Sequence, residues 1–280
     1  MVGRARGRRR GVPRMNAVAA EFRREVGSAY EAAASSWALG AAVIYAHLAE
    51  ALVDNVPPLG AGPVLDLCAG TGAASVPLVR RGLAVIALDL APAMLAVDRA
   101  RRPPAIAADA LALPLRSRSF AAVVVACGLN HATDPVAFLA EAGRVTRAGG
   151  FVATSTFAAG WTHPAKSAVD EALVPFGFQA PHWHRRFKSD IEPATAEPDV
   201  LCAIALRAGL RAPRVTTVAV AIDVTAEQAV GWRFAMASHV GFLATLAAQH
   251  RRQATDDAIA AVRRRWEPLV IPLLVLCARV

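Results

Sequence analysis

Short apolar runs alternate with helix-like segments through the middle of the chain. The apolar runs are residues 64–68, 84–89, 105–109, 121–127 and 150–157. Strands that are apolar along nearly their whole length and are separated by helices indicate a parallel sheet buried on both faces. The pattern therefore predicts a doubly wound α/β domain.

The flanking regions follow other patterns. Residues 17–53 are rich in alanine and space their apolar residues by three and four, which predicts a helix, and the prolines and glycines of 56–62 end it. Residues 158–200 are rich in proline, tryptophan and histidine, and predict an irregular, partly helical insertion. Beyond them we expect a helix at 200–210, a strand at 214–224, three helical stretches between 226 and 266, and a closing strand from 269.

These patterns divide the chain into five segments. We expect a disordered basic tail at 1–14, an N-terminal helical cap at 15–56, a cofactor-binding core at 57–157 and an insertion over the substrate at 158–200. Residues 201–280 are expected to complete the sheet and to add cap helices.

The positive charge is concentrated at the N-terminus. The net charge is +9, and the first fourteen residues hold six arginines and no acid, which leaves 9 − 6 = +3 for the rest. A run of like charges without acidic partners is expected to remain solvated and disordered. Met15 is an alternative start of the protein. Such a tail can also bind phosphates, so a nucleic-acid substrate stays open as an alternative.

The apolar runs and the cysteines indicate neither a membrane nor a metal. No run approaches the ~18 apolar residues that a membrane span needs. Cys68, Cys127, Cys202 and Cys277 lack the spacing of a zinc site. We expect a cytoplasmic protein with reduced cysteines, no membrane contact and no metal.

A glycine turn follows the first core strand. Gly70 and Gly72 allow the backbone to approach a ligand, at the edge where parallel strands end and ligands of open α/β sheets bind. The six residues from Gly70 read GTGAAS, with Ser75 where a dinucleotide motif has its third glycine, and no P-loop lysine follows. The turn therefore favours a ligand without a phosphate chain.

Two aspartates end the next two strands. Asp89 can accept hydrogen bonds from two ribose hydroxyls, and Asp109 can accept one from an adenine amino group beside the backbone of Ala110. A ribose acid, an adenine acid and a glycine turn without phosphate chemistry together suggest the cofactor S-adenosylmethionine.

The order of these motifs carries a family resemblance. Residues 64–72 resemble motif I of class I S-adenosylmethionine-dependent methyltransferases, and Asp89, residues 109–131 and residues 137–157 follow in that family's order. The match covers 63–157, with a weaker one over 200–280, and is most similar to the ubiquinone/menaquinone-biosynthesis branch. The resemblance implies a mostly parallel, seven-stranded Rossmann-like methyltransferase fold with an antiparallel last strand and a helical cap. It also implies S-adenosyl-L-homocysteine as a product.

The resemblance also implies roles for particular residues. Asp66 would steady the turn and the amino-acid end of the cofactor, Asp89 and Leu90 would lie at the ribose, and Asp109 and Ala110 at the adenine. The methionine part would lie along Cys68, Ala69, Gly70 and Gly72, with Cys127 beside the sulfonium and Tyr30 folded over the cofactor. The chain departs from the family pattern at Cys68, in place of a glycine, and at Ala121, in place of a frequent aspartate.

The acceptor pocket is expected under the helical cap, because the tryptophans lie outside the core block. We expect it to be lined by Trp37, Trp161, His163, Trp183 and Trp232. If the acceptor is a hydroxyl, a histidine can remove its proton. The candidates are His131, His163, His182, His184 and His239, with His239 and His131 ranked first. The pair His182 and His184 lacks a third ligand, so no metal is predicted.

The leading hypothesis is methyl transfer to an O, N or C nucleophile of a small, largely apolar acceptor. A nucleic-acid methyltransferase is the second, but residues 127–135 lack the Asn/Asp-Pro-Pro-aromatic turn that holds a flipped base. A third is a protein that binds the cofactor without methylating, such as a cyclase or a structural partner. The oligomeric state stays open, with a homodimer as one option.

Overall fold

The computed structural model describes residues 12–58 and 60–280. Their strands form one seven-stranded sheet in the order β3-β2-β1-β4-β5-β7-β6. The strands are β1 Val64–Leu67, β2 Val85–Asp89, β3 Ala105–Ala107, β4 Phe120–Ala126, β5 Thr146–Phe157, β6 Arg211–Ile222 and β7 Leu269–Arg279. Strands β1 to β5 pair in parallel, and β7 is antiparallel to both β5 and β6. The predicted doubly wound, mostly parallel sheet with an antiparallel last strand is confirmed.

The sheet is buried on both faces, as its apolar strands require. Along β4, Val124 packs into one core and Val123 and Val125 into the other. This alternation follows from the two-residue period of a strand. The first core lies under α2 Ala41–Asp54 and α3 Ser75–Arg80, and the second lies under α5 Pro135–Val145 and α8 Pro198–Arg207.

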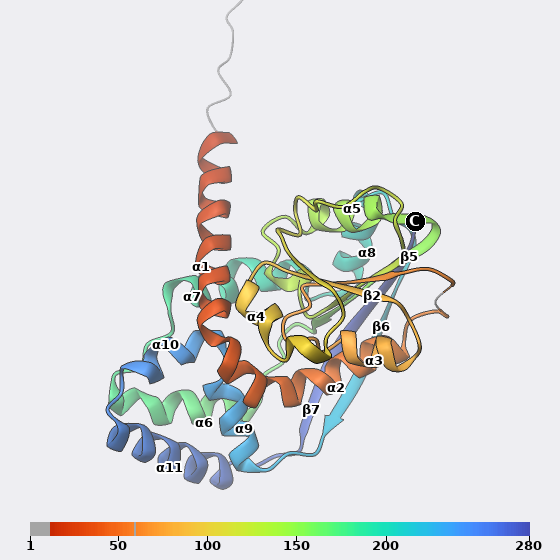
Figure 1. Ribbon diagram of the computed structural model, residues 1–280. Coiled ribbons are helices and arrows are strands. Elements are labelled where there is room, and N and C mark those ends of the chain that lie inside the picture. Colours follow the sequence, from red (N-terminus) through yellow and green to blue (C-terminus); the bar gives the residue numbers. More distant parts are fainter. Residues whose placement is uncertain (1–11, 59) are drawn as a thin grey trace, which may run out of the picture.

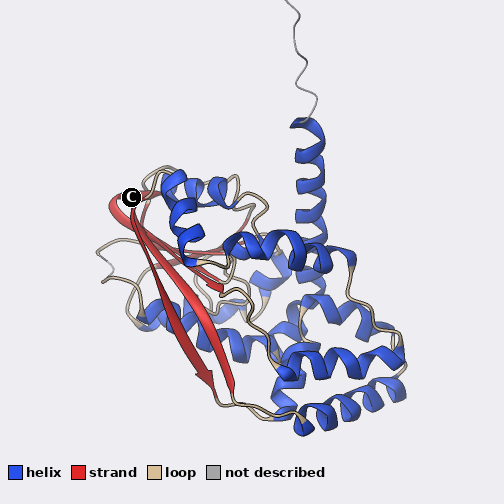
Figure 2. Ribbon diagram, turned by 180° about the vertical axis from the view of Figure 1, so that it is seen from behind, coloured by secondary structure: helices blue, strands red, loops and turns tan. Residues whose placement is uncertain are grey.

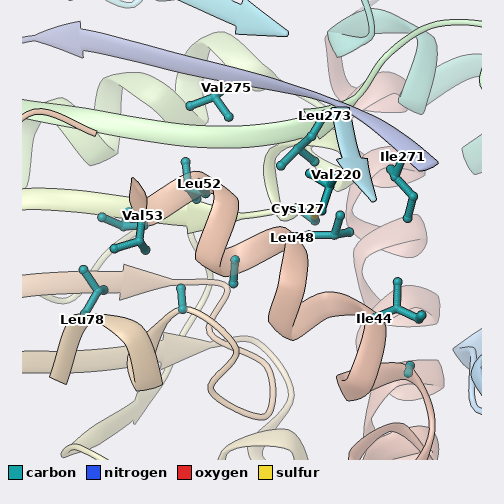
Figure 3. Packing of buried hydrophobic residues seen from close by; sticks show 14 of the residues in the cluster. Ile44, Leu48, Leu52, Val53, Leu78, Cys127, Val220, Ile271, Leu273 and Val275 are labelled. Carbon is teal, nitrogen blue, oxygen red and sulfur yellow. The ribbon is translucent and has the colours of Figure 1, made fainter. Parts of the chain in front are cut away.

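The two N-terminal helices bend sharply at Gly40. Helix α1 Val12–Leu39 and helix α2 meet at 87°. A Cβ at residue 40 would come within 2.4 Å of the carbonyl oxygen of Gly231, so the close approach requires glycine. Figure 3 shows Ile44, Leu48 and Leu52 of α2 pointing into the first core, near side chains of the last two strands.

The N-terminal helix begins earlier than the sequence pattern predicts. Helix α1 starts at Val12, within the range expected to be a tail, and its first turns extend away from the body (Figure 1). The rest of the predicted tail, residues 1–11, lies outside the described residues. No single helix of the described chain is long and apolar enough to cross a membrane; only α1 and α2 together, a bent pair, reach that length and composition.

A helical cap stands at one end of the sheet. Helices α6 Pro164–Leu173, α9 Ala226–Phe234, α10 Ala237–Thr245 and α11 Ala248–Arg264 gather there (Figure 1). The long strands β6 and β7 lie at one edge of the sheet and extend as far as this cap (Figure 2). Helix α9 begins with a capping box formed by Thr225 and Gln228, which explains its sharp start. The predicted insertion contains α6, the short helix α7 His182–Arg186 and three irregular turns up to Thr195.

Candidate functional site

A cavity lies beyond the carboxyl ends of β1, β2 and β4, where the strand order reverses. Nearly all of the residues predicted to hold the cofactor line it; Asp66 and Gly72 lie outside the lining found in the described chain. The predicted residues in the lining are Tyr30, Cys68, Ala69, Gly70, Asp89, Leu90, Asp109, Ala110 and Cys127. We call it the cofactor-side cavity.

Asp89 ties the first two strands together at this cavity. Its Oδ2 accepts a hydrogen bond from the backbone N–H of Gly70 at 2.8 Å, and its Oδ1 accepts one from Ala91 at 2.9 Å. Gly70 has φ of 51° and Gly72 has φ of 96°, in the left-handed region that favours glycine. Burial raises the pKa of the Asp89 carboxyl, and the two backbone donors oppose that shift. Asp89 therefore fixes the turn as well as facing the cavity.

Unpartnered polar atoms flank the glycine turn. The Oδ2 of Asp66 accepts from the Ser75 hydroxyl at 2.6 Å, but its Oδ1 is buried with no hydrogen-bond partner in the described residues. The Nε and Nη2 of Arg102 are also buried and unpartnered, and a Cβ at Gly72 would lie 3.1 Å from that Nε. Burial raises the pKa of Asp66 to about 6. The sequence analysis missed Arg102, because it lies in an arginine-rich loop, residues 99–102, that looks like ordinary solvated surface.

Helix α1 closes the cavity over the third strand. Arg23 on α1 lies with its Nε 3.3 Å from the Oδ2 of Asp109. Glu31 on the same helix accepts a hydrogen bond from the N–H of Ala93 at 2.9 Å. The carboxylate predicted to face adenine is thus paired with an arginine in this structure.

A second, larger cavity of about 870 Å³ lies under the helical cap. This volume is within the ~300–1,000 Å³ that is typical of small-molecule sites. Of the tryptophans predicted to line the acceptor pocket, Trp161, Trp183 and Trp232 line this cavity, and Trp37 lines the cofactor-side cavity. Phe157 stacks on Trp161 with ring centroids 5.7 Å apart. We call it the cap cavity.

Tyr30 and His131 line both cavities. The Tyr30 hydroxyl lies 3.2 Å from the Nε2 of His131, and the imidazole stacks on Phe187 at 4.4 Å between centroids. Burial, and then the charge of Lys188, lowers the pKa of His131 to about 4, so the ring is neutral at pH 7. Burial raises the pKa of Tyr30, so its phenol stays protonated.

Two predicted histidines do not reach a cavity, which corrects the sequence analysis. His163 is buried, and its Nδ1 accepts the N–H of Ala165 at 3.2 Å, so it caps α6. His239, the first-ranked base, is 1% exposed: its Nε2 lies 2.9 Å from Asp170, and its ring stacks on Phe178. Neither side chain lines either cavity in the described chain. Both were selected because they lie in the cap, but helix packing turned them inward.

The other two histidine candidates lie in α7. His184 lines the cap cavity, and burial and neighbouring cations lower its pKa to about 3; His182 is outside both linings. Across residues 12–58 and 60–280, no group of three or more His, Cys, Asp or Glu side chains is arranged to hold a metal ion.

The fold and the cavities together define a doubly wound protein with a cavity at its topological switch point, the position where open α/β sheets bind ligands. A family model for the methyltransferase domain matches residues 65–154. Demethylmenaquinone methyltransferase from Renibacterium salmoninarum is 40% identical over 125 residues, which cover 44% of this chain and 53% of that protein. The enzyme of the same name from Streptomyces griseus is 32% identical over 159 residues, covering 54% of this chain and 68% of its own.

A solved structure shares the fold. Phosphoethanolamine N-methyltransferase 2 from Haemonchus contortus has a TM-score of 0.52 at 16% identity, covering 82% of this chain and 52% of that one. The chain belongs to the class I S-adenosylmethionine-dependent methyltransferases, in the branch of the quinone-biosynthesis enzymes. It spans about half the length of several of the curated relatives that it matches.

Proposed function

We propose that this chain transfers the methyl group of S-adenosylmethionine to an O, N or C nucleophile of a small, largely apolar acceptor with an aromatic or quinone-like ring. One observation carries the proposal: the cofactor-side cavity and the cap cavity share Tyr30, Tyr45 and His131. The first cavity has the acids and the glycine turn, and the second has aromatic walls. Methyl transfer needs donor and acceptor in line and in contact, and a shared boundary of this kind permits it.

The residues present fit the cofactor at both of its ends. Asp89 and Asp109 offer carboxylate oxygens for the ribose hydroxyls and the adenine amino group. At the glycine turn, the unpartnered Oδ1 of Asp66 matches an ammonium group, and the unpartnered nitrogens of Arg102 match a carboxylate. An unsatisfied buried polar atom is costly, so a zwitterionic amino-acid end would relieve both.

When bound, S-adenosylmethionine supplies an already activated methyl group. The chain therefore has to position the acceptor, exclude water and, for a hydroxyl acceptor, move one proton. We assign this last task to Tyr30 and His131. The phenol oxygen accepts the proton of the acceptor while the phenol O–H passes its own to the neutral Nε2 of His131. This relay requires the imidazole tautomer that carries its proton on Nδ1.

Replacing Arg102 with methionine is expected to weaken S-adenosylmethionine binding about 5- to 10-fold, since a charge-assisted hydrogen bond to the carboxylate is worth roughly 1.5–3 kcal/mol and Arg102 is only half-buried. Calorimetric titration measures the effect. Arg101→Met removes the same charge from an exposed neighbour and should leave the affinity unchanged. Equal affinities for both variants would remove Arg102 from the site.

The proposed activity is tested with purified full-length chain, cofactor labelled on the methyl group and a panel of quinol, phenol and amine acceptors. Mass spectrometry of the product separates the hypotheses. A gain of one methyl supports transfer, and an isomer of the starting compound supports a cyclase. Label that enters RNA or DNA but no small molecule would favour the nucleic-acid alternative.

A further inference from the structure

Lys166 is a cation without a counter-ion at the wall of the cap cavity. It lies in the first turn of α6, and its Nζ is 4.4 Å from the ring centroid of Trp161. Among the described residues it has neither a salt bridge nor a hydrogen-bond acceptor, whereas the chain's other lysine, Lys188, pairs with Glu192. Lys166 is half-buried, and a partly desolvated charge is stabilised by an opposite charge beside it, so an anion in the cavity would be favoured at this position.

The acid one helical turn along α6 from Lys166 is already occupied. Both oxygens of Asp170 accept from the Nη2 of Arg233, at 2.7 and 2.9 Å, and the Nε2 of His239 lies 2.9 Å from the same carboxylate. Although burial acts in the opposite direction, His239 and Arg233 lower the pKa of Asp170 to about 2, so it stays ionised in this network. His239, rejected above as a base, therefore acts as a positioning residue for Asp170.

Arg233 adds a second donor to the same wall. The side chain is 5% exposed and lines the cap cavity, and its Nε has no hydrogen-bond partner in the described part of the chain. The charged side chains in the cavity wall are four cations and three acids, an excess of one positive charge. The cations are Lys166, Arg185, Lys188 and Arg233, and the acids are Asp170, Glu192 and Glu197.

Two aromatic side chains lie beside Lys166 and bear on the shape of the ligand that this wall would accept. Phe157 and Trp161 are stacked with an interplanar angle of 11°, both line the cap cavity, and the Nζ of Lys166 lies over the Trp161 ring. A planar ring packs well against such side chains, and an acidic substituent of that ring would reach the ammonium.

We propose that the acceptor of this enzyme is an aromatic carboxylic acid, whose carboxylate pairs with Lys166 and, beside it, Arg233. The inference rests on the proposed function, because it takes the cap cavity as the acceptor site. It narrows the acceptor from a largely apolar ring compound to a ring compound with one anionic group.

The test compares two probes of the same shape, 2-naphthoate and 2-naphthamide, by calorimetric titration of the full-length chain at pH 7 with S-adenosylhomocysteine present. We expect 2-naphthoate to bind about 10-fold more tightly than the neutral amide, from one charge-assisted contact. Lys166→Met should abolish that preference, and Lys166→Arg, which keeps the charge, should retain most of it.

Arg265→Met is the matched control. It also removes one positive charge next to α6, since Arg265 pairs with Glu171 at 2.7 Å, but it does so outside the cap cavity. This variant should keep the preference for 2-naphthoate. Melting curves report whether each variant folds, and Lys166→Arg gives a second variant should Lys166→Met lose stability.

The preference should also depend on pH with a defined sign. Burial, and then the charges of Arg233 and Lys188, lowers the pKa of Lys166 to about 8, while Glu192 and Asp170 oppose the shift. The ammonium is charged below that pH, so the preference should narrow as the pH rises from 7 to 9. In Lys166→Arg it should stay constant over that range.

Equal affinity for the two probes, no measurable binding of 2-naphthoate, or an undiminished preference in Lys166→Met would each overturn the proposal. The proposed methyl transfer is judged separately, by titration of S-adenosylmethionine in the same preparations. A chain that binds the cofactor but shows no preference for the acid keeps the function and loses the acidic acceptor. If the native chain does not bind S-adenosylmethionine, the proposed methyl transfer is ruled out as well.

Discussion

Replacing Asp89 with alanine is expected to weaken S-adenosylmethionine binding about 10- to 100-fold, because the ribose hydroxyls lose a charged acceptor worth roughly 1.5–3 kcal/mol. The same carboxylate holds the N–H groups of Gly70 and Ala91, so its loss also loosens the turn at the cavity. Calorimetric titration with the cofactor measures the effect, and a melting curve reports whether the fold survives.

Two comparisons separate the ribose contact from the turn. Asp199→Ala removes an exposed carboxylate in the first turn of α8 and should leave the affinity unchanged. A cofactor analogue that lacks the ribose hydroxyls should bind the native chain weakly. The Asp89→Ala substitution should lower the affinity for this analogue only slightly further. If the variant weakens both ligands by the same factor, the carboxylate acts through the turn alone and the ribose assignment fails.

The sheet was predictable because each of its central strands is apolar and short. Strand β1 is buried along its whole length and β4 along all but its last residue, and a parallel sheet covered by helices on both faces buries strands in this way. The positions of Asp89 and Asp109 followed from the same reasoning, since the carboxyl ends of parallel strands meet at one edge. Both side chains line the predicted cavity.

The interior of the cap was not predictable. Asp170 and His239 are 69 residues apart in the chain and meet only when α6 and α10 pack together. No local pattern indicates such a contact, so the sequence analysis ranks His239 as a candidate base on a cap helix. The same holds for Lys166, because the missing counter-ion is a property of the folded cavity wall. Sequence periodicity shows which side of a helix is buried but does not show which polar groups meet there.

Replacing His131 with alanine is expected to lower kcat about 10²- to 10⁴-fold for a hydroxyl acceptor, because the relay from Tyr30 then has no proton acceptor. Cofactor affinity should change little, since the acids that hold the nucleoside are untouched. Single-turnover rates with saturating acceptor measure the loss. His250→Ala, a change at an exposed histidine of α11, should leave the rate unchanged.

Two further variants decide whether His131 accepts the proton or only supports Tyr30. His131→Gln can still accept a hydrogen bond from the phenol but is not basic, so it should be as slow as His131→Ala. Tyr30→Phe should be slow as well, and the double variant no slower than either single one, because both residues serve one transfer.

The pKa of His131 near 4 also sets the pH dependence. Below that pH the imidazole is protonated and cannot take another proton, so kcat should fall as the pH drops through about 4 and should show no inflection near the ordinary histidine value of about 6.5. Full activity of His131→Gln would make the histidine a support for Tyr30 and leave catalysis to proximity and orientation alone.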